Sequence, residues 1–592
     1  MTAADRPLTV LILAGGSLSE KQLGPAPCLN SQPADLADGS GLARDRIIRH
    51  YRSQSDHLQV RLLIDRGAQT PRPHLSDGLM QPLCIAPQPS VIESVRAALE
   101  QIATPWLLLI PVTTLPSGPA TADHRIELGD TALPRENWSA VSAPNSATPV
   151  FHNKTAPPSD GEPPSHPFTG VICARTSTIA ALLGEPMNHD DPSDLLVLAQ
   201  RLYRCTKTRF HFSPWRDLGH RATYSSSRLS RLSSRSFNRV VYEPDGDLIR
   251  KGSSNPERLQ QEHLYLKQLP QSVRRYFPAL VSPDLTRNRK GDLSMELDYV
   301  PFPNLAELFL HWRIGINGWE QIARRLALIR SALQRSDGDT TTCPQAHLGW
   351  LYSGKLQQRL QQLAIDPPDS RGAIGLNWHQ FWNNSLALEL GSAQNTVRLT
   401  LPSPQLCCSV LMEELPSLES TRPLTRIHGD LCFNNILAEP LSGSIRLIDP
   451  RGERPPGTNW PVGYGDPRYD LVKLLHSSRY LYDVVVNGLF HLECVDTTVR
   501  LQLDVPAQQS IADQAIHRYL VRDQLTADEE RLLTASLFFS MLPLHRSEPK
   551  HCLAFACIGA LIIERQFDSV LSQGMHRAQN RSDPSSRSRS SL

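Results

Sequence analysis

The chain has 592 residues, enough for roughly two to four domains that each bury a core. Its 61 basic and 59 acidic side chains nearly balance, so nothing in the charge indicates a protein of nucleic acids or membrane surfaces. The 11 cysteines are an odd number with no Cys-x-x-Cys pair, which is typical of reduced thiols. No long apolar run and no secretory signal is visible. We therefore expect a cytoplasmic protein without a membrane span.

Strand and helix patterns alternate along the first part of the chain. Leu8–Ala14 is an almost continuous apolar run that ends in Gly15-Gly16, as in a buried parallel strand that opens a phosphate loop. Further strands are predicted at 58–65, 106–112 and 168–175, and helices at 42–52, 91–102 and 194–202. This alternation predicts an α/β layer with a parallel sheet. Residues 140–167 hold seven prolines, which indicates a long loop rather than a regular element.

Two segments of this part resemble the sugar-phosphate nucleotidyltransferases. Leu13-Ala-Gly-Gly16 stands where that family has a glycine-rich loop, and Trp215-Arg-Asp-Leu-Gly219 resembles its second metal-binding segment, with Asp217 as the ligand. The sequence departs from the family after Gly16, where the glycine and arginine that hold a triphosphate are replaced by Ser-Leu-Ser-Glu. It departs again at Pro111-Val-Thr113, where the family has Gly-Asp. Nucleotidyl transfer depends on those charges, so we expect a degenerate, inactive domain over residues 1–224.

A serine- and arginine-rich stretch at 225–235 is the expected linker to a second domain. Two strands, 236–242 and 248–251, are joined by a polar turn and followed by a helix at 255–269. Lys251 ends the second strand, and its neighbour Arg250 points to the opposite face because side chains alternate along a strand. A shift of register by one residue would exchange the two.

The rest of the chain is mainly helical. A strand at 293–300 breaks into the turn Pro301-Phe-Pro303. Helices are predicted at 305–312, 319–334, 351–363, 378–390, 470–489, 511–520, 527–542 and 551–567, and residues 409–415 lead into the central motif. The final residues 577–592 are low in apolar side chains and are predicted to be disordered.

The central motif is a predicted β-hairpin with a carboxylate at each end. Its strands are 435–437 and 445–448; Asp430 precedes the first and Asp449 follows the second. Asn435 lies five residues after Asp430. A hydroxyl nucleophile needs a carboxylate to accept its proton, and a nucleotide needs oxygen ligands that hold Mg²⁺ against its phosphates. Asp430 suits the first task, and Asn435 with Asp449 suits the second.

His428-Gly-Asp-Leu and Asn435-Ile-Leu, followed by Asp449 and by Gly465-Asp-Pro-Arg-Tyr-Asp470, resemble the catalytic core of the aminoglycoside phosphotransferase and choline kinase-like families. These are small-molecule relatives of the protein kinases. The resemblance implies that Asp430 orients and deprotonates an acceptor hydroxyl while Asn435 and Asp449 hold Mg²⁺. It also implies that His428 supports the catalytic loop by hydrogen bonds and that Asp470 accepts backbone N–H groups from it.

The same resemblance assigns a nucleotide site to the preceding strands and helix. Lys251, paired with Glu262, would bind the α- and β-phosphates of ATP or GTP. No glycine-rich loop is present, and Ser236 lies among the serines that would cradle phosphate in its place. The strand at 293–300 would form the hinge that binds the adenine edge.

We therefore expect a nucleotidyltransferase-like (GT-A or Rossmann-like) α/β domain, then a bilobal protein kinase-like α+β domain at 236–576. Its N-lobe would span 236–300 and its helical C-lobe 301–576. The predicted function is an ATP- or GTP-dependent, Mg²⁺-requiring phosphotransferase acting on a small-molecule or glycan hydroxyl. The two-part arrangement resembles proteins of bacterial capsular polysaccharide biosynthesis. Alternatives are a bifunctional enzyme with a working nucleotidyltransferase half, and a nucleotide-binding scaffold without activity.

Overall fold

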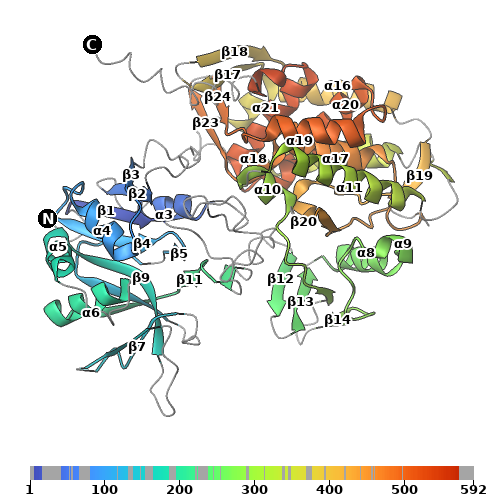
Figure 1. Cartoon of the computed structure of the whole chain (residues 1–592). Coiled ribbons are helices and arrows are strands. Elements are labelled where there is room, and N and C mark those ends of the chain that lie inside the picture. The colour runs from blue at the N-terminus through green and yellow to red at the C-terminus, as the bar shows by residue number, and fades with distance from the viewer. Residues whose placement is uncertain are drawn as a thin grey trace. The chain divides into compact units, whose positions relative to one another are not determined.

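The structure is a computed structural model of the whole chain (Figure 1). It describes residues 6–15, 36, 42–52, 54, 58–65, 81–116, 118–130, 138–146, 148–153, 165–185, 195–220, 223–224, 238–243, 246–253, 255–287, 293–311, 314–335, 341–343, 348–368, 377–392, 395–418, 422–439, 442–454, 458, 460–495 and 498–571. The chain divides into two compact units, Met1–Leu232 and Ser233–Leu592. The expected linker at 225–235 and the expected tail at 577–592 lie outside the described residues.

The first unit is built on a mixed sheet in the order β10-β6-β9-β4-β1-β2-β3. Its strands on this path are β1 (Leu8–Leu13), β2 (Gln59–Asp65), β3 (Gln81–Ile85), β4 (Trp106–Pro111), β6 (Arg125–Gly129), β9 (Ser165–Arg175) and β10 (Phe210–Ser213). β1 runs parallel to β2 and β4, and β9 is antiparallel to both of its neighbours. The predicted α/β layer with parallel strands is confirmed.

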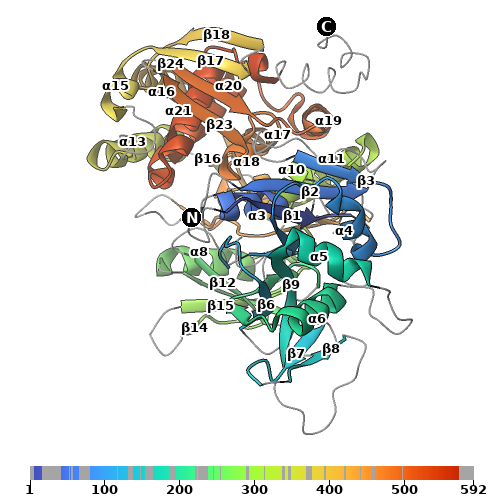
Figure 2. The same ribbon diagram turned by 90° about the vertical axis from the view of Figure 1, so that its left-hand side faces the viewer.

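Helices cover both faces of this sheet. They are α3 (Ala43–Arg52), α4 (Val91–Leu99), α5 (Thr176–Gly184) and α6 (Leu195–Thr206). α3 packs on one face through Ile47, Ile48 and Tyr51. The other three helices form a separate apolar layer on the opposite face (Figure 2). The continuous apolar run of β1 follows from this arrangement, because all six of its residues are buried between two helical layers.

One expectation for the first unit is wrong. Residues 140–167 are not a loop without regular structure, since β7 (Ala140–Ser142) pairs with β8 (Val150–His152) and with the beginning of β9. Val141 is fully buried against the α4–α6 face. The prolines hid these elements because β7 and β8 are only three residues long, Pro144 and Pro149 lie just beyond their ends, and Pro167 stands inside β9 opposite Ala140.

The second unit opens with a four-stranded antiparallel sheet in the order β12-β13-β15-β14. The elements of this lobe are β12 (Asn238–Glu243), β13 (Leu248–Ser253), α8 (Pro256–Lys267), α9 (Gln271–Arg274), β14 (Thr286–Arg287) and β15 (Leu293–Asp298). α8 starts where Asn255 accepts the backbone N–H of Arg258, with Pro256 in the first turn. The two predicted strands, the helix and the hinge strand are all present.

The remainder of this unit is a larger, mainly helical lobe. Its α-helices are α10 (Leu305–His311), α11 (Ile316–Arg335), α13 (Lys355–Ile365), α15 (Trp378–Asn383), α16 (Pro404–Leu418), α17 (Arg468–Ser478), α18 (Tyr482–Val486), α19 (Gln509–Ile516), α20 (Ala527–Met541) and α21 (Pro549–Ile563). Short π- or 3-10-helical turns lie at 350–354, 433–435, 517–521 and 542–545. The predicted helix 470–489 is interrupted at Leu481, which has a φ of 60°.

One hairpin and two sheets complete the described part of this lobe. The predicted hairpin is present as β20 (Ile436–Glu439) and β21 (Ser444–Leu447). A short three-stranded sheet has the order β16 (Thr341–Cys343), β19 (Arg422–Arg426), β22 (Tyr464–Gly465).

A further four-stranded sheet lies at the end of the helical lobe away from β12–β15 (Figures 1 and 2). Its strands are β17 (Leu386–Ser392), β18 (Asn395–Leu401), β23 (Phe490–Val495) and β24 (Thr498–Leu503). The predicted helix 378–390 is therefore wrong in its second half. Leu386, Leu388 and Leu390 are buried while Glu389 points outward, which is the alternation of a strand.

Candidate active site

The loop between β19 and β20, which carries His428 and Asp430, is held by a buried carboxylate. Asp470, in the first turn of α17, accepts the backbone N–H groups of His428 and Gly429 at 2.8 Å each. Gly429 has a φ of 78°, and a Cβ on it would lie 2.8 Å from the Cβ of Arg451. The loop is thus fixed at a position where only glycine fits.

His428 links this loop to the end of β21. Its ring is fully buried, its Nε2 lies 3.0 Å from the carbonyl of Ile448, and its Nδ1 lies 3.3 Å from the backbone N–H of Asp430. Burial lowers the pKa of His428, so the neutral ring donates from Nε2 and accepts at Nδ1. This is a supporting arrangement rather than that of a base or a metal ligand.

Lys251 lies between two carboxylates from different parts of the chain. Its Nζ is 2.6 and 2.7 Å from the carboxylate oxygens of Glu262 on α8, and 2.6 Å from Oδ1 of Asp449 after β21. Burial lowers the pKa of Lys251, but Asp449 and Glu262 outweigh it, so the net shift is upward and the ammonium stays charged. Burial raises the pKa of Glu262 despite Lys251.

The register of β13 decides between Lys251 and Arg250. The Arg250 side chain is 46% exposed and pairs with Glu243 and Glu296 on the outer face, whereas the Lys251 side chain is only 10% exposed. Lys251 is therefore the residue that faces the other motifs. Ser236, the predicted phosphate-binding serine, lies outside the described residues.

Asn435 and Asp449 meet at the ends of the hairpin. The amide nitrogen of Asn435 donates to the backbone carbonyl of Asp430 at 2.8 Å, so its amide oxygen is the atom that could bind a cation. Asp449 has a φ of 58° and carries a carboxylate that Lys251 and Arg451 both approach. Asp449 thus has a left-handed backbone conformation and a carboxylate in contact with two cationic side chains. Such a carboxylate could also bind a divalent cation.

This donor set fits Mg²⁺. One carboxylate and one amide oxygen are hard ligands, and Mg²⁺ in nucleotide sites takes its other ligands from phosphates and water. No group of three or more histidines, cysteines or acidic residues with metal-site geometry occurs within the described ranges. Asn435 and Asp449 are therefore the residues that could hold Mg²⁺ here, and their role as its ligands stays a prediction.

Two cations that the sequence did not suggest hold Asp430. Arg451 donates to its Oδ2 from Nη2 at 2.7 Å and also lies 3.4 Å from Asp449. Lys473, one turn after Asp470 on α17, lies 3.1 Å from Oδ1. Lys473 stands three residues after Asp470 on the same helix face, a spacing that could have indicated its direction. Asp430, Asp449 and Lys251 are thereby joined in one charged network.

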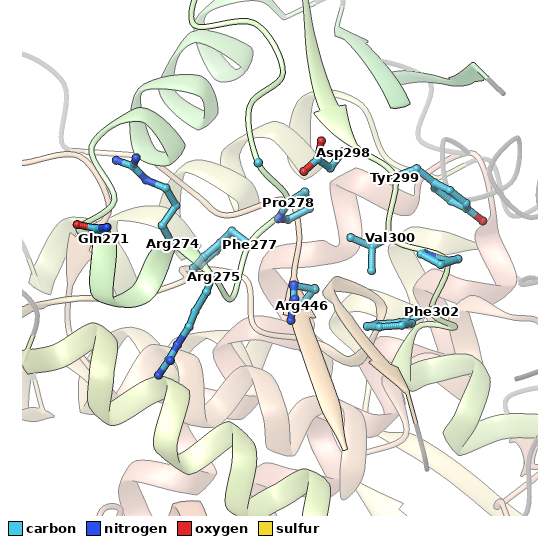
Figure 3. A pocket seen from close by; sticks show the side chains of 12 residues that line it. Gln271, Arg274, Arg275, Phe277, Pro278, Asp298, Tyr299, Val300, Phe302 and Arg446 are labelled. Atoms are coloured by element: carbon cyan, nitrogen blue, oxygen red, sulfur yellow. The ribbon is translucent and has the colours of Figure 1, made fainter. Parts of the chain in front are cut away.

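A pocket of this unit lies beside the end of β15 and has a volume of about 780 Å³. It is lined by Asp298–Phe302, by Phe277–Ala279, and by basic residues that include Arg446. Figure 3 shows Arg446 coming from β21, with Tyr299, Val300 and Phe302 along one side. None of Lys251, Glu262, Asp430 and Asp449 lines it, although Arg446 comes from the strand that ends just before Asp449.

The first unit places Asp217 in a closed hydrogen-bond cluster. β11 (Arg216–Asp217) pairs with β5 (Thr114–Leu115), which follows Pro111-Val-Thr113 at the end of β4. The Asp217 carboxylate accepts from the backbone N–H of Gly219 at 2.9 Å and from Trp138 Nε1 at 3.0 Å, and lies 2.6 Å from His220 Nδ1. Both oxygens are therefore engaged. Gly16 of the glycine-rich segment lies outside the described residues.

The comparisons with known proteins give distant structural likenesses only. No family model and no curated protein matches the chain. A protein described as a glucose-1-phosphate thymidylyltransferase from Bacillus anthracis is 10% identical, with a TM-score of 0.26 over 37% of this chain and 94% of its own. HddC from Yersinia pseudotuberculosis is 12% identical, with a TM-score of 0.27 over 37% and 97%.

A third solved structure is the GDP complex of aminoglycoside 2'-phosphotransferase-IIIa. It is 14% identical, with a TM-score of 0.31 over 56% of this chain and 90% of its own. At such TM-scores the likenesses carry no weight for fold or activity, which rest on the strand order and side-chain geometry above. Within the described ranges, no helix is both long and apolar enough to cross a membrane.

Proposed function

We propose that the second unit is an ATP- or GTP-dependent phosphotransferase that acts on a hydroxyl group of a small molecule. One observation carries this proposal: β13, α8 and the end of β21, 198 residues apart at the extremes, bring Lys251, Glu262 and Asp449 into direct contact. Arg451 joins that contact to Asp430. A buried lysine between two carboxylates, beside a third carboxylate on a loop fixed by Asp470, is what phosphoryl transfer requires for positioning and charge neutralisation.

Each residue then has one task. Lys251, held by Glu262, binds the α- and β-phosphates. Asp430 orients the acceptor hydroxyl and takes its proton as the hydroxyl oxygen bonds to the γ-phosphorus. The bond from that phosphorus to the β–γ bridging oxygen breaks, and the nucleoside diphosphate leaves with the electron pair. Asn435 and Asp449 would hold Mg²⁺, which when bound would supply neutralising charge for the phosphates.

We further propose that the acceptor is a sugar or glycan intermediate of bacterial surface polysaccharide synthesis and that the first unit transfers no nucleotide. The first point rests on the resemblance of the two-part arrangement. The second is supported by the Asp217 carboxylate, whose oxygens are engaged by Gly219, Trp138 and His220. Labelled nucleotide transfer to a sugar phosphate that Asp217→Ala abolishes and Asp430→Asn spares would contradict it.

The test measures nucleoside diphosphate formation from ATP or GTP with Mg²⁺, using a panel of sugars and crude surface-glycan extract as acceptors. Asp430→Asn and Asp449→Ala are each expected to lose about 10²-fold or more of the acceptor-dependent rate, since each removes a group that acts in the transition state. Asp284→Asn is the matched control, because Asp284 is an exposed carboxylate 82% accessible beside Lys267.

The result that overturns the proposal is tight nucleotide binding with no turnover on any acceptor. If Asp430→Asn also left the biological role intact, the second unit would be a nucleotide-binding scaffold.

A further inference from the structure

The two carboxylate oxygens of Asp430 contact different cations. Oδ2 contacts Arg451, which also approaches Asp449, and Oδ1 contacts Lys473, which belongs to a cluster formed by two helices and one segment. α17 contributes Lys473 and Tyr469, α13 contributes Lys355, and the chain after Asp449 contributes Glu453. Attacking and leaving oxygens lie roughly in line during phosphoryl transfer, so the acceptor approaches opposite the leaving diphosphate. Arg451, Asp449 and Lys251 follow on from Oδ2, on the proposed diphosphate side, so the cluster at Oδ1 is the candidate for the acceptor side.

Lysines and a tyrosine join there into a continuous cluster. Lys473 contacts Asp430 at 3.1 Å, and its Nζ lies 5.9 Å from the centre of the Tyr469 ring. The Tyr469 hydroxyl lies 3.1 Å from Lys355 Nζ, and Lys355 in turn lies 3.6 Å from Glu453. The Lys473 and Lys355 side chains are 13% and 26% exposed, so both are held by packing and still reach solvent.

Positive charge exceeds negative charge in this cluster. Five cations (Arg451, Lys473, Lys355, Arg359 and Arg258) stand against three carboxylates (Asp430, Asp449 and Glu453). Lys355 lowers the pKa of Glu453 against the opposing effect of burial, with Arg359 acting in the same direction. Arg359 bonds to the amide of Gln362 and makes no ion pair within the described part of the chain. The surplus is two positive charges.

We infer that the acceptor of the proposed phosphotransferase carries an anionic group, a phosphate or a carboxylate, which Lys355 and Lys473 bind beside the reacting hydroxyl. This inference rests on the proposed function and names its substrate class. A cationic acceptor would meet like charges at this position, and a neutral sugar would leave the surplus uncompensated. The guanidinium of Arg451 is shared between Asp430 and Asp449 and so connects this cluster to the Lys251 ion pair.

The acceptor is unidentified, so the probe is crude surface-glycan extract separated by anion exchange into a retained and an unretained fraction. The full chain is assayed for acceptor-dependent diphosphate formation with ATP and Mg²⁺. Stimulation by the retained fraction, with a KM that rises as salt is added, is the expected result. Loss of stimulation after alkaline phosphatase identifies the group as a phosphate; loss after chemical reduction of carboxyl groups identifies it as a carboxylate.

Variants connect the charge preference to these residues. Lys355→Gln is expected to raise the KM for the retained fraction about tenfold, the factor that one modest ionic contact contributes. Lys355→Glu raises it further, and Lys550→Gln, which removes an exposed lysine at the start of α21, leaves it unchanged.

Stimulation confined to the unretained fraction overturns this inference while the proposed phosphotransfer stands. An equal KM in Lys355→Gln and Lys550→Gln also overturns it. Failure of the proposed function looks different, because no fraction and no sugar would then support turnover, even where ATP binds.

Discussion

Replacing Lys251 by methionine separates the structural role of the buried ion pair from its proposed role in nucleotide binding. Glu262 has both carboxylate oxygens on the Lys251 ammonium, at 2.6 and 2.7 Å, and its side chain is 6% exposed. Asp449 is better protected, because Arg451 remains 3.4 Å from it. Lys251→Met therefore leaves one buried carboxylate without its counter-ion. Breaking a buried pair in this way costs about 3–5 kcal/mol of folding free energy.

The second variant removes the orphaned charge as well. In Lys251→Met/Glu262→Met the buried carboxylate is replaced by an apolar chain of similar length, and buried pairs replaced by apolar residues are often neutral in stability. We expect the double variant to recover to within about 1 kcal/mol of the wild type. Both variants should lose nucleotide-dependent turnover, since neither has the ammonium that binds phosphate.

The pH dependence gives an independent check. Burial raises the pKa of Glu262 above its unfolded value even beside Lys251, and removing Lys251 raises it further. The folded single variant then binds a proton more readily than the unfolded chain, so its stability falls as pH rises. The deficit of Lys251→Met relative to wild type should be smaller at about pH 5.5 than at about pH 8.

The measurement is chemical denaturation of the full chain at both pH values, with turnover assayed in parallel. If the double variant is as unstable as the single one, the cost does not come from the orphaned Glu262. A deficit that grows at the lower pH would refute the assignment of the buried charge.

Three further changes test the rest of the site. Gly429→Ala introduces a Cβ at a φ of 78° and 2.8 Å from the Arg451 Cβ. We expect the free energy of unfolding, measured by denaturation, to fall by about 1–2 kcal/mol from the backbone alone, with a larger relative loss of turnover. Wild-type values for both would contradict this. Asp470→Asn puts an amide N–H against one of the two backbone donors, which should lower the free energy of unfolding by about 1.5–3 kcal/mol. We expect kcat to fall by a larger factor than the KM for nucleotide rises. The reverse would place Asp470 in nucleotide binding. Asp217→Ala leaves three donors without an acceptor and should lower the stability of the first unit by about 1–3 kcal/mol. Phosphotransfer should be unchanged. A loss of phosphotransfer would contradict the assignment of activity to the second unit.

The parts of the site that follow from local sequence could be predicted. The hairpin strands, the carboxylates at its ends and the helix carrying Glu262 depend on spacing and alternation within about ten to twenty residues. The outward direction of Arg250 and the inward direction of Lys251 follow from alternation once the strand is placed.

The errors and omissions have a common physical cause. Leu386-Ala-Leu-Glu-Leu390 contains good helix formers, so local sequence predicts the continuation of a helix where β17 stands. Its partner strand β24 begins more than a hundred residues later in the chain, and local sequence does not reveal that pairing. Arg451 and Lys473 were missed because their partner Asp430 lies 21 and 43 residues away and no local pattern records an ion pair of that kind. Tertiary contacts decided both cases.

The difference between the two units lies in what surrounds their aspartates. Asp217 is held by a backbone N–H, an indole and an imidazole, all fixed by the turn and the rings that carry them, so a metal could bind only by breaking that cluster. Asp430 and Asp449 are held instead by the long side chains of Lys251, Arg451 and Lys473. A phosphate group offers such cations the same kind of oxygen acceptor, so they can move to it without losing a counter-charge. A carboxylate network whose cations can exchange a carboxylate for a phosphate is suited to phosphoryl transfer. A cluster such as that of Asp217, in which fixed groups occupy both carboxylate oxygens, is suited to holding a turn.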